Sequence, residues 1–70
     1  MTDLIALKQL INDSGMTMVA LSKKSGISRE TLYNRLNGIG EFRVSEIRGL
    51  AEALCMSSMQ RNKIFFGQER

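Results

Sequence analysis

The stretch TMVALSKKSGISRETLYNRLNG, Thr17 to Gly38, predicts two short helices joined by a very short turn. Thr17 and Ser28 each precede a helix-forming run, and a hydroxyl at that position can accept a hydrogen bond from a free N–H group at the start of a helix. Gly26 and Gly38 come where each run stops, and glycine readily adopts the left-handed conformation that ends a helix. The predicted helices are Met18 to about Ser25 and Arg29 to about Asn37.

The rest of the chain predicts three further helices. Proline is absent and the apolar residues recur at helical spacings, which indicates an all-α protein. Thr2 or Asp3 can cap a first helix that Gly15 ends, and Ser57 with Gln60 forms a capping-box pattern that starts the last one. A fourth helix is expected from Val44 or Ser45 to Cys55. The positions expected inside or beside the core are Leu4, Ile5, Leu7, Leu10, Ile11, Val44, Ile47, Leu50, Ala51, Leu54, Met59, Ile64, Phe65 and Phe66.

The turn SGIS is too short for two antiparallel helices, so the helices on either side of it should cross steeply. This is the helix-turn-helix arrangement, whose second helix lies in the major groove of DNA. We expect Ile27 to anchor the turn, and the small side chain of Ser22 to allow the closest approach of the two helices. The chain is then one compact five-helix domain over residues 1–66, with the helix-turn-helix at about 17–37 and a frayed tail at 67–70.

The outward side of the second helix of this pair carries polar side chains. Successive residues turn by about 100°, so if Leu32 and Leu36 face the core, Glu30 and Asn34 face away from it. Such side chains can recognise base edges, and Thr can contact the thymine methyl group. The expected base-reading residues are Arg29, Glu30, Thr31 and Asn34. The expected contacts to the sugar-phosphate backbone on these grounds are Thr17, Lys23, Ser28, Tyr33 and Arg35.

Several of these residues also have a structural interpretation. Glu30 suits the positive end of a helix, and Tyr33 could pack against the following loop. Thr17 and Ser28 are helix caps first. Arg29 and Arg35 could be solvated charges.

The charge distribution favours an anionic partner. The chain holds 10 basic and 7 acidic residues, a net charge of +3. Within residues 16–40, Lys23, Lys24, Arg29 and Arg35 stand against Glu30, so four minus one places a net +3 in this segment. The chain has no histidine and one cysteine, Cys55, which we expect in the core. No metal site, internal disulfide, catalytic constellation, cofactor or small-molecule substrate is expected, and neither is a membrane span. We expect a cytoplasmic protein that is not an enzyme.

The segments MTMVALSKKSGISRETLYNRLNG, EFRVSEIRGLAEAL and IFF resemble the phage repressor and Cro class of helix-turn-helix proteins, the xenobiotic-response-element family. The resemblance covers roughly residues 4–66. It implies a lambda-repressor-like domain that binds a pseudo-palindromic operator as a symmetric dimer, with bases read at Arg29, Glu30, Thr31 and Asn34. It also implies phosphate contacts by the following loop, at Asn37, Gly38 and Arg43. Met18 departs from the family's frequent Gln, and Ser22 and Ser25 replace residues that are usually alanine and apolar.

The expected function is a sequence-specific regulator of transcription that binds double-stranded DNA, most simply a Cro-like phage or prophage repressor. We expect a homodimer, weak away from DNA, with Phe42, Met56, Met59 and Phe65 or Phe66 as candidate contacts. Two alternatives stay open: a protein-interaction module of the same fold, such as an autoregulating antitoxin, and the DNA-binding half of a larger repressor. The short end GQER favours the plain repressor, because it cannot wrap a toxin.

Overall fold

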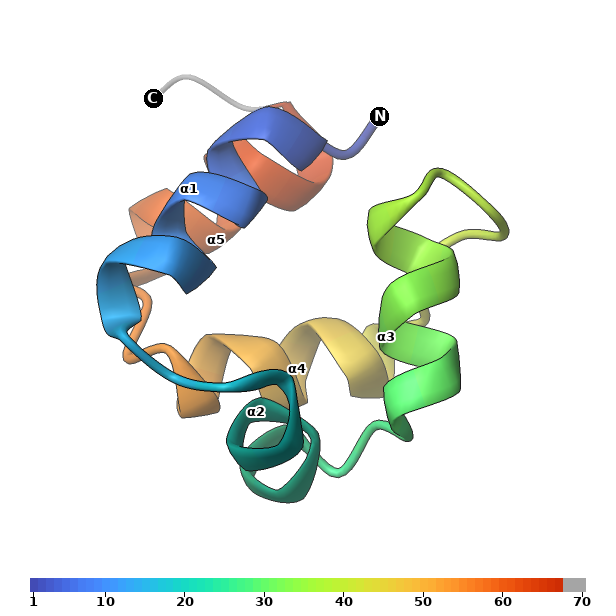
Figure 1. Cartoon of the computed structure of the whole chain (residues 1–70). Helices are drawn as coiled ribbons and strands as arrows, with labels where there is room; N and C mark the ends of the chain where they lie inside the picture. Colours follow the sequence, from blue (N-terminus) through green and yellow to red (C-terminus); the bar gives the residue numbers. More distant parts are fainter. Residues whose placement is uncertain (68–70) are drawn as a thin grey trace.

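The computed structural model describes residues 1–67, and this part of the chain folds into five α-helices without strands (Figure 1). The all-α, five-helix prediction is confirmed. Residues 68–70, and with them most of the predicted tail at 67–70, lie outside the described residues. The helices are α1 (Leu4–Ser14), α2 (Met18–Ser25), α3 (Arg29–Leu36), α4 (Val44–Ala53) and α5 (Ser58–Phe66).

Local capping contacts start most of the helices where the sequence predicts. The Asp3 carboxylate accepts a hydrogen bond from the Ala6 N–H group at 3.0 Å and begins α1. In the capping box of α5, Ser57 Oγ accepts from the Gln60 N–H group and Gln60 Oε1 accepts from the Ser57 N–H group, both at 3.1 Å. At the other end of α1, Gly15 has a φ of 74°, in the left-handed region. Each of these residues acts on a backbone group at most three positions away in the sequence. The helix ends could therefore be located from the sequence alone.

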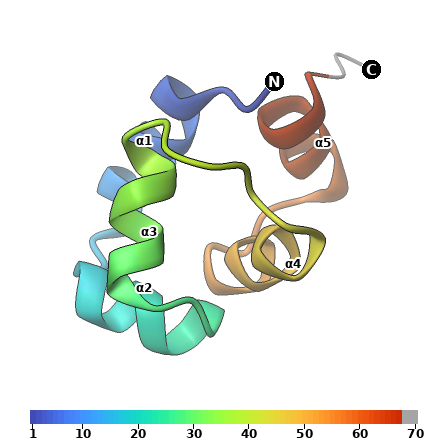
Figure 2. The same cartoon turned by 90° about the vertical axis from the view of Figure 1, so that its right-hand side faces the viewer.

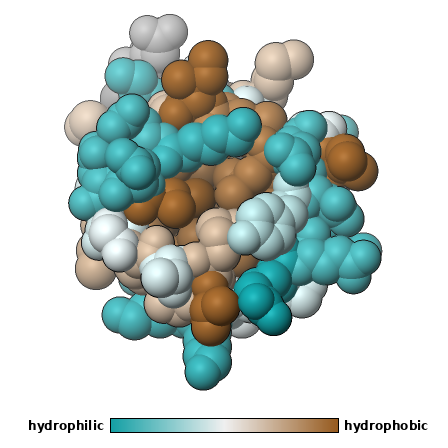
Figure 3. All heavy atoms as spheres, in the orientation of Figure 1, coloured by the Kyte–Doolittle hydropathy of each residue, from teal (hydrophilic) through white to brown (hydrophobic). Residues whose placement is uncertain are grey.

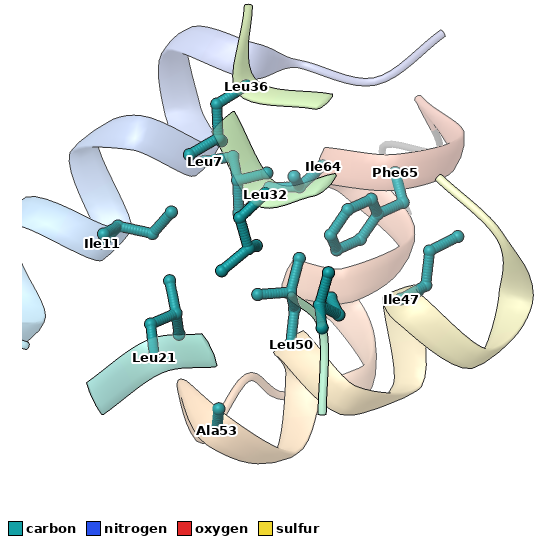
Figure 4. Packing of buried hydrophobic residues seen from close by; sticks show 11 residues of the cluster. Leu7, Ile11, Leu21, Leu32, Leu36, Ile47, Leu50, Ala53, Ile64 and Phe65 are labelled. Atoms are coloured by element: carbon teal, nitrogen blue, oxygen red, sulfur yellow. The ribbon is translucent and has the colours of Figure 1, made fainter. Parts of the chain in front are cut away.

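The core lies where all five helices converge. Four leucines, one from each of α1 to α4, are fully buried, and α5 adds Ile64 and Phe65. Figure 4 shows these side chains pointing toward one another between the helices. Phe65 also packs edge-on against Phe42 of the α3–α4 loop, with ring centroids 5.2 Å apart. The buried residues are Leu7, Ile11, Leu21, Ile27, Leu32, Leu36, Ile47, Leu50, Ala53, Ile64 and Phe65.

Several apolar residues expected inside the protein are at its surface instead. Ile5, Val44, Met59 and Phe66 are between 51% and 84% exposed. They have helical spacing from buried residues, but they lie at the edges of the apolar stripes, where no other part of residues 1–67 covers them. Half-buried positions on the same stripes are Leu4, Leu10, Ala51 and Leu54.

Two helices end one or two residues earlier in the chain than the sequence predicts. α3 ends at Leu36, with Asn37 as its C-cap, and α4 ends at Ala53, with Leu54 as its C-cap. Cys55 then has a φ of 53°, the left-handed region that helices use to terminate. The prediction that Cys55 is buried was wrong, because this conformation turns the chain out of α4 and leaves the thiol exposed.

A close backbone approach joins α2 to α4. Gly49, in the middle of α4, lies directly against the carbonyl group of Ser25, and a Cβ atom added to Gly49 would overlap the Ser25 oxygen. α4 is also the helix against which α2 packs most extensively. This contact holds the end of α2, and therefore the turn that leads into α3, against the body of the domain (Figures 1 and 2). The sequence analysis did not foresee this contact; its prediction that α2 and α3 approach each other most closely at Ser22 concerns a different pair of helices and stays a prediction.

Candidate nucleic-acid interface

A short polar turn sets the position of α3 relative to α2. Thr17 Oγ1 accepts from the Ala20 N–H group at 3.1 Å at the start of α2, and Ser28 Oγ accepts from the Thr31 N–H group at 3.2 Å at the start of α3. Between them, Gly26 ends α2 with a φ of 77°, and Ile27 is buried as expected. The two helices leave the turn in clearly different directions (Figure 1). This is the helix-turn-helix geometry that the sequence predicts.

The hydroxyl of Ser22 stabilises this turn in a way that the sequence analysis missed. Ser22 Oγ donates a hydrogen bond to the carbonyl oxygen of Ile27, across the turn. Ser25 Oγ reaches the same region, since it accepts from the Ile27 N–H group at 3.3 Å. The two serines stand where the resembling family usually has alanine and an apolar residue. A pair of serines spaced three apart, just before a turn glycine, is the signal that could have indicated these bonds.

The outer side of α3 is polar, as Figure 3 shows along this helix. Leu32 and Leu36 are 0% and 8% exposed, so the predicted inward positions are confirmed. Arg29 and Glu30 are exposed, as expected for side chains that reach DNA bases. Tyr33 is 52% exposed, so its side chain is accessible beside Arg29 and Glu30.

Thr31 and Asn34 are less accessible than a base-reading role predicts. Both are half-buried. Thr31 Oγ1 accepts a hydrogen bond from Ser28 Oγ at 2.9 Å, and Thr31 lines a polar hollow shared with Arg43 and Glu46 at the start of α4. The α3–α4 loop and the first turn of α4 cover this side of α3. The exposed stripe is therefore centred on Glu30 and Tyr33 rather than on Glu30 and Asn34.

Arg35 has an internal role. We expected its guanidinium beside the sugar-phosphate backbone, but its side chain is only 17% exposed. Arg35 Nε lies 3.3 Å from Glu46 Oε1 in an ion pair, and another guanidinium nitrogen donates to the Ile39 carbonyl oxygen at 3.2 Å. Glu46 Oε1 also accepts from the Arg43 N–H group at 3.0 Å, which caps α4. The charge of Arg35 therefore already has a partner within the protein, and its contact with the DNA backbone stays a prediction.

The loop that follows α3 is folded around this arginine. Gly40, with a φ of 76°, passes so close to the Arg35 guanidinium that a Cβ atom there would overlap it. The Ile39 N–H group donates to the Asn34 carbonyl oxygen at 2.8 Å, so Ile39 is held through both of its backbone groups. Its side chain is nevertheless 59% exposed. The pairing of Arg35 with Glu46 could not be seen in the sequence, because eleven positions separate them and no local pattern links them.

The other residues that we expect to contact the sugar-phosphate backbone of DNA are at the protein surface. They border the polar side of α3, at the start of α2, at the end of α2, at the turn and in the α3–α4 loop. Their exposure makes each of them accessible to a phosphate group. These exposed residues are Thr17, Lys23, Ser28, Asn37, Gly38 and Arg43.

Residues 1–67 contain no group of three His, Cys, Asp or Glu residues placed to hold a metal ion. The buried side chains among them are all apolar. No helix in this range is long and apolar enough to cross a membrane.

Comparisons with known proteins agree with this geometry. A family model described as helix-turn-helix matches residues 7–55, which is 49 of the 70 residues. The match runs from α1 to the end of α4 and includes the whole of α2, the turn and α3. Neither a search of curated proteins nor a search of solved structures found a significant match.

Proposed function

The chain belongs to the Cro/C1-type helix-turn-helix family of DNA-binding transcription regulators, and on this basis we propose that it is a sequence-specific repressor. It would bind a pseudo-palindromic operator as a homodimer, in the manner of small Cro-like phage and prophage regulators. Occupying the operator would exclude RNA polymerase from the promoter.

The observation that carries this proposal is the exposed polar stripe of α3. Arg29, Glu30 and Tyr33 project from the helix that follows the turn, while the opposite side of that helix is buried in the core. A helix held in this way can enter the major groove, which is wide enough to admit it. We propose that Arg29 and Glu30 read bases and that Tyr33 contacts a base or a sugar on the same side. Asn34 and Thr31 would also contact bases, from the edge of the stripe.

Basic and polar groups around the stripe would hold the DNA backbone. The exposed cations nearest to it are Lys23 and Lys24 at the end of α2, Arg29 at the start of α3 and Arg43 at the start of α4. The capped helix starts at Thr17 and Ser28 add backbone N–H groups, which favour an anion. Asn37 and Gly38 would contact the backbone beyond the end of α3. Arg35 would act indirectly, by fixing the loop that carries Gly38.

The salt dependence of DNA binding tests the proposal. Bound duplexes are first selected from a random pool, and the affinity for the best site is then measured over a range of salt concentrations. Each neutralised phosphate adds about 0.9 to the slope of log affinity against log salt. The three exposed cations that are left for the DNA backbone, Lys23, Lys24 and Arg43, therefore predict a slope of about −3 for each protomer. A selection that enriches no sequence, or a slope near zero, would refute the proposal.

Variants separate base reading from backbone contact. Lys23→Ala should weaken binding to all duplexes alike and reduce the slope by about one, because it removes one phosphate contact. Arg29→Ala should cost about 1–3 kcal/mol on the selected site and relax the preference at one base pair. Lys63→Ala is the matched control, since Lys63 is an exposed lysine on α5, away from the stripe. It should leave both the affinity and the slope unchanged.

A further inference from the structure

Two hydroxyl groups at the end of α2 hold Ile27, the residue in the middle of the turn that leads into α3. Ser22 Oγ donates a hydrogen bond to the Ile27 carbonyl oxygen, and Ser25 Oγ accepts one from the Ile27 N–H group at 3.3 Å. Ser25 Oγ also donates to the Ser22 carbonyl oxygen at 3.4 Å. The Ile27 side chain is 5% exposed and packs in the core. Ile27 is therefore fixed through both of its backbone groups and through its side chain. We call Ser22 and Ser25 the serine pair.

The serine pair is itself attached to the body of the domain. The carbonyl group of Ser25 lies directly against Gly49 in α4, and α2 packs more extensively against α4 than against any other helix. The side chains of both serines are half-buried between these elements. Because the end of α2 cannot move freely, Ile27 is a fixed point from which the chain enters α3 (Figure 1).

The orientation of α3 depends on this fixed point. α3 begins at Arg29, two positions after Ile27, and the helix against which it packs most extensively is α2. Its eight residues make it about 12 Å long, so a tilt of about 10° at the turn would move its far end by about 2 Å. Hydrogen bonds to base edges need donor–acceptor distances of about 2.7–3.2 Å. A tilt of this size would therefore misdirect the outward side chains of α3.

Packing alone does not require hydroxyl groups at these two positions. Alanine at position 22 would be small enough for the same approach of the helices, but it would give the Ile27 carbonyl oxygen no donor. An apolar residue at position 25 would likewise offer no acceptor to the Ile27 N–H group. The hydrogen bonds of the serine pair thus act on the backbone of the turn, and through it on the direction of α3.

We propose that Ser22 and Ser25 are positioning residues for DNA recognition. Their hydroxyl groups set the orientation of α3 relative to α2, so that Arg29 and Glu30 meet the base edges. The serines themselves contact no DNA. This inference rests on the proposed function, because it states how the chain obtains its preference for one sequence. Ser22 contributes more than Ser25, since its bond to Ile27 is the shorter of the two.

The affinities of Ser22→Ala for the selected duplex and for an unrelated duplex test the proposal, at a temperature where circular dichroism shows the variant to be folded. Affinity for the selected duplex should fall by about tenfold or more, the loss of one good base contact. Affinity for the unrelated duplex and the salt slope should not change, because Lys23, Lys24 and Arg43 are kept.

Ser57→Ala is the matched control for this experiment. It is the same substitution and also removes a hydrogen bond, but in the capping box of α5, away from α3. It should lower the stability and leave both affinities unchanged. If Ser22→Ala and Ser57→Ala bind the selected duplex equally well, the proposal is overturned.

Base preference gives a readout that a loss of stability would not change. Selection with Ser22→Ala should show a weaker preference at every base pair read by α3, whereas Arg29→Ala relaxes one. Adding Arg29→Ala to Ser22→Ala should weaken binding at least about threefold less than it does in the wild type, because a misdirected Arg29 has less to lose. Losses that simply multiply would overturn the proposal.

Ser25→Ala keeps the test available if Ser22→Ala does not fold. It breaks the longer bond to Ile27, so it should relax the same base pairs by a smaller factor. A Ser25→Ala variant with the full preference of the wild type would overturn the role of Ser25.

The wild type distinguishes this inference from the proposed function. If the wild type enriches no sequence from the random pool, the proposed function fails and the inference fails with it. If the wild type enriches a sequence that Ser22→Ala binds with the same affinity and preference, the positioning role fails and the proposed function stands.

Discussion

Gly49 offers the sharpest test of how the helix-turn-helix is attached to the rest of the domain. Gly49→Ala adds one methyl group in the middle of α4, where alanine ordinarily stabilises a helix by up to about 1 kcal/mol relative to glycine. In this protein the new Cβ atom would overlap the Ser25 carbonyl oxygen and lie 3.1 Å from the carbonyl carbon. Ordinary contacts between nonbonded atoms are about 3.5–4.0 Å. The substitution therefore sets helix propensity against packing.

Packing should dominate because the obstacle is backbone. A carbonyl group at the end of α2 cannot rotate away as a side chain would, so α2 and α4 must move apart. Overpacking of this kind typically costs about 1–3 kcal/mol. With the upper end of that range and the gain in propensity, we expect a net loss of about 2 kcal/mol in the free energy of unfolding. For a domain of this size, that corresponds to a fall of about 8–16 °C in Tm.

Thermal unfolding followed by circular dichroism, together with urea titration, measures this loss. Glu52→Ala is the control, because Glu52 is exposed on the same helix and its replacement should change the stability by less than about 0.5 kcal/mol. Movement of Ser25 also shifts the turn that positions α3, so operator affinity should fall with the stability. A Gly49→Ala variant as stable as the wild type, or more stable, would refute the close approach of α2 and α4.

Three further substitutions test single contacts, each by the change in the free energy of unfolding from urea titration. Ser57→Ala removes the capping box of α5 and should cost about 1 kcal/mol. Ser22→Ala leaves the Ile27 carbonyl oxygen without its donor and should cost about 1–3 kcal/mol; a neutral result would mean that water replaces the hydroxyl. Arg35→Met leaves Glu46 without its cation in a mostly buried position and should cost about 1–3 kcal/mol. A double-mutant cycle with Glu46→Gln checks that this cost belongs to the pair, and additive losses would show that it does not.

The features that sequence predicts well here are those decided within a few residues. Thr17, Gly26 and Ser28 each act on backbone groups at most four positions away, and the structure places them as expected. The inward positions of Leu32 and Leu36 follow from helical periodicity and are likewise confirmed. These local rules were sufficient to predict the helix-turn-helix and the five-helix fold.

Features that depend on distant neighbours could not be predicted in this way. Periodicity shows which side of α3 faces the core, but it does not show that the following loop covers the side carrying Thr31 and Arg35. Val44 has the spacing of a core residue and is exposed, because no other part of residues 1–67 covers the side of α4 on which it lies. Gly49 looked like an ordinary helical position, and its role depends on a carbonyl group 24 positions away.

Glu46 Oε1 accepts hydrogen bonds from both Arg35 and the Arg43 N–H group, and this limits which substitutions positions 35 and 46 can accept. Exchanging the charges, with glutamate at position 35 and arginine at position 46, would keep an attractive pair. It would still fail, because arginine has no acceptor for the Arg43 N–H group that begins α4. Glutamate at position 35 would also have no donor for the Ile39 carbonyl oxygen. The two charges therefore cannot be exchanged one at a time without loss: a change at position 35 removes the ion pair and the bond to Ile39, and a change to arginine at position 46 removes the ion pair and the cap of α4.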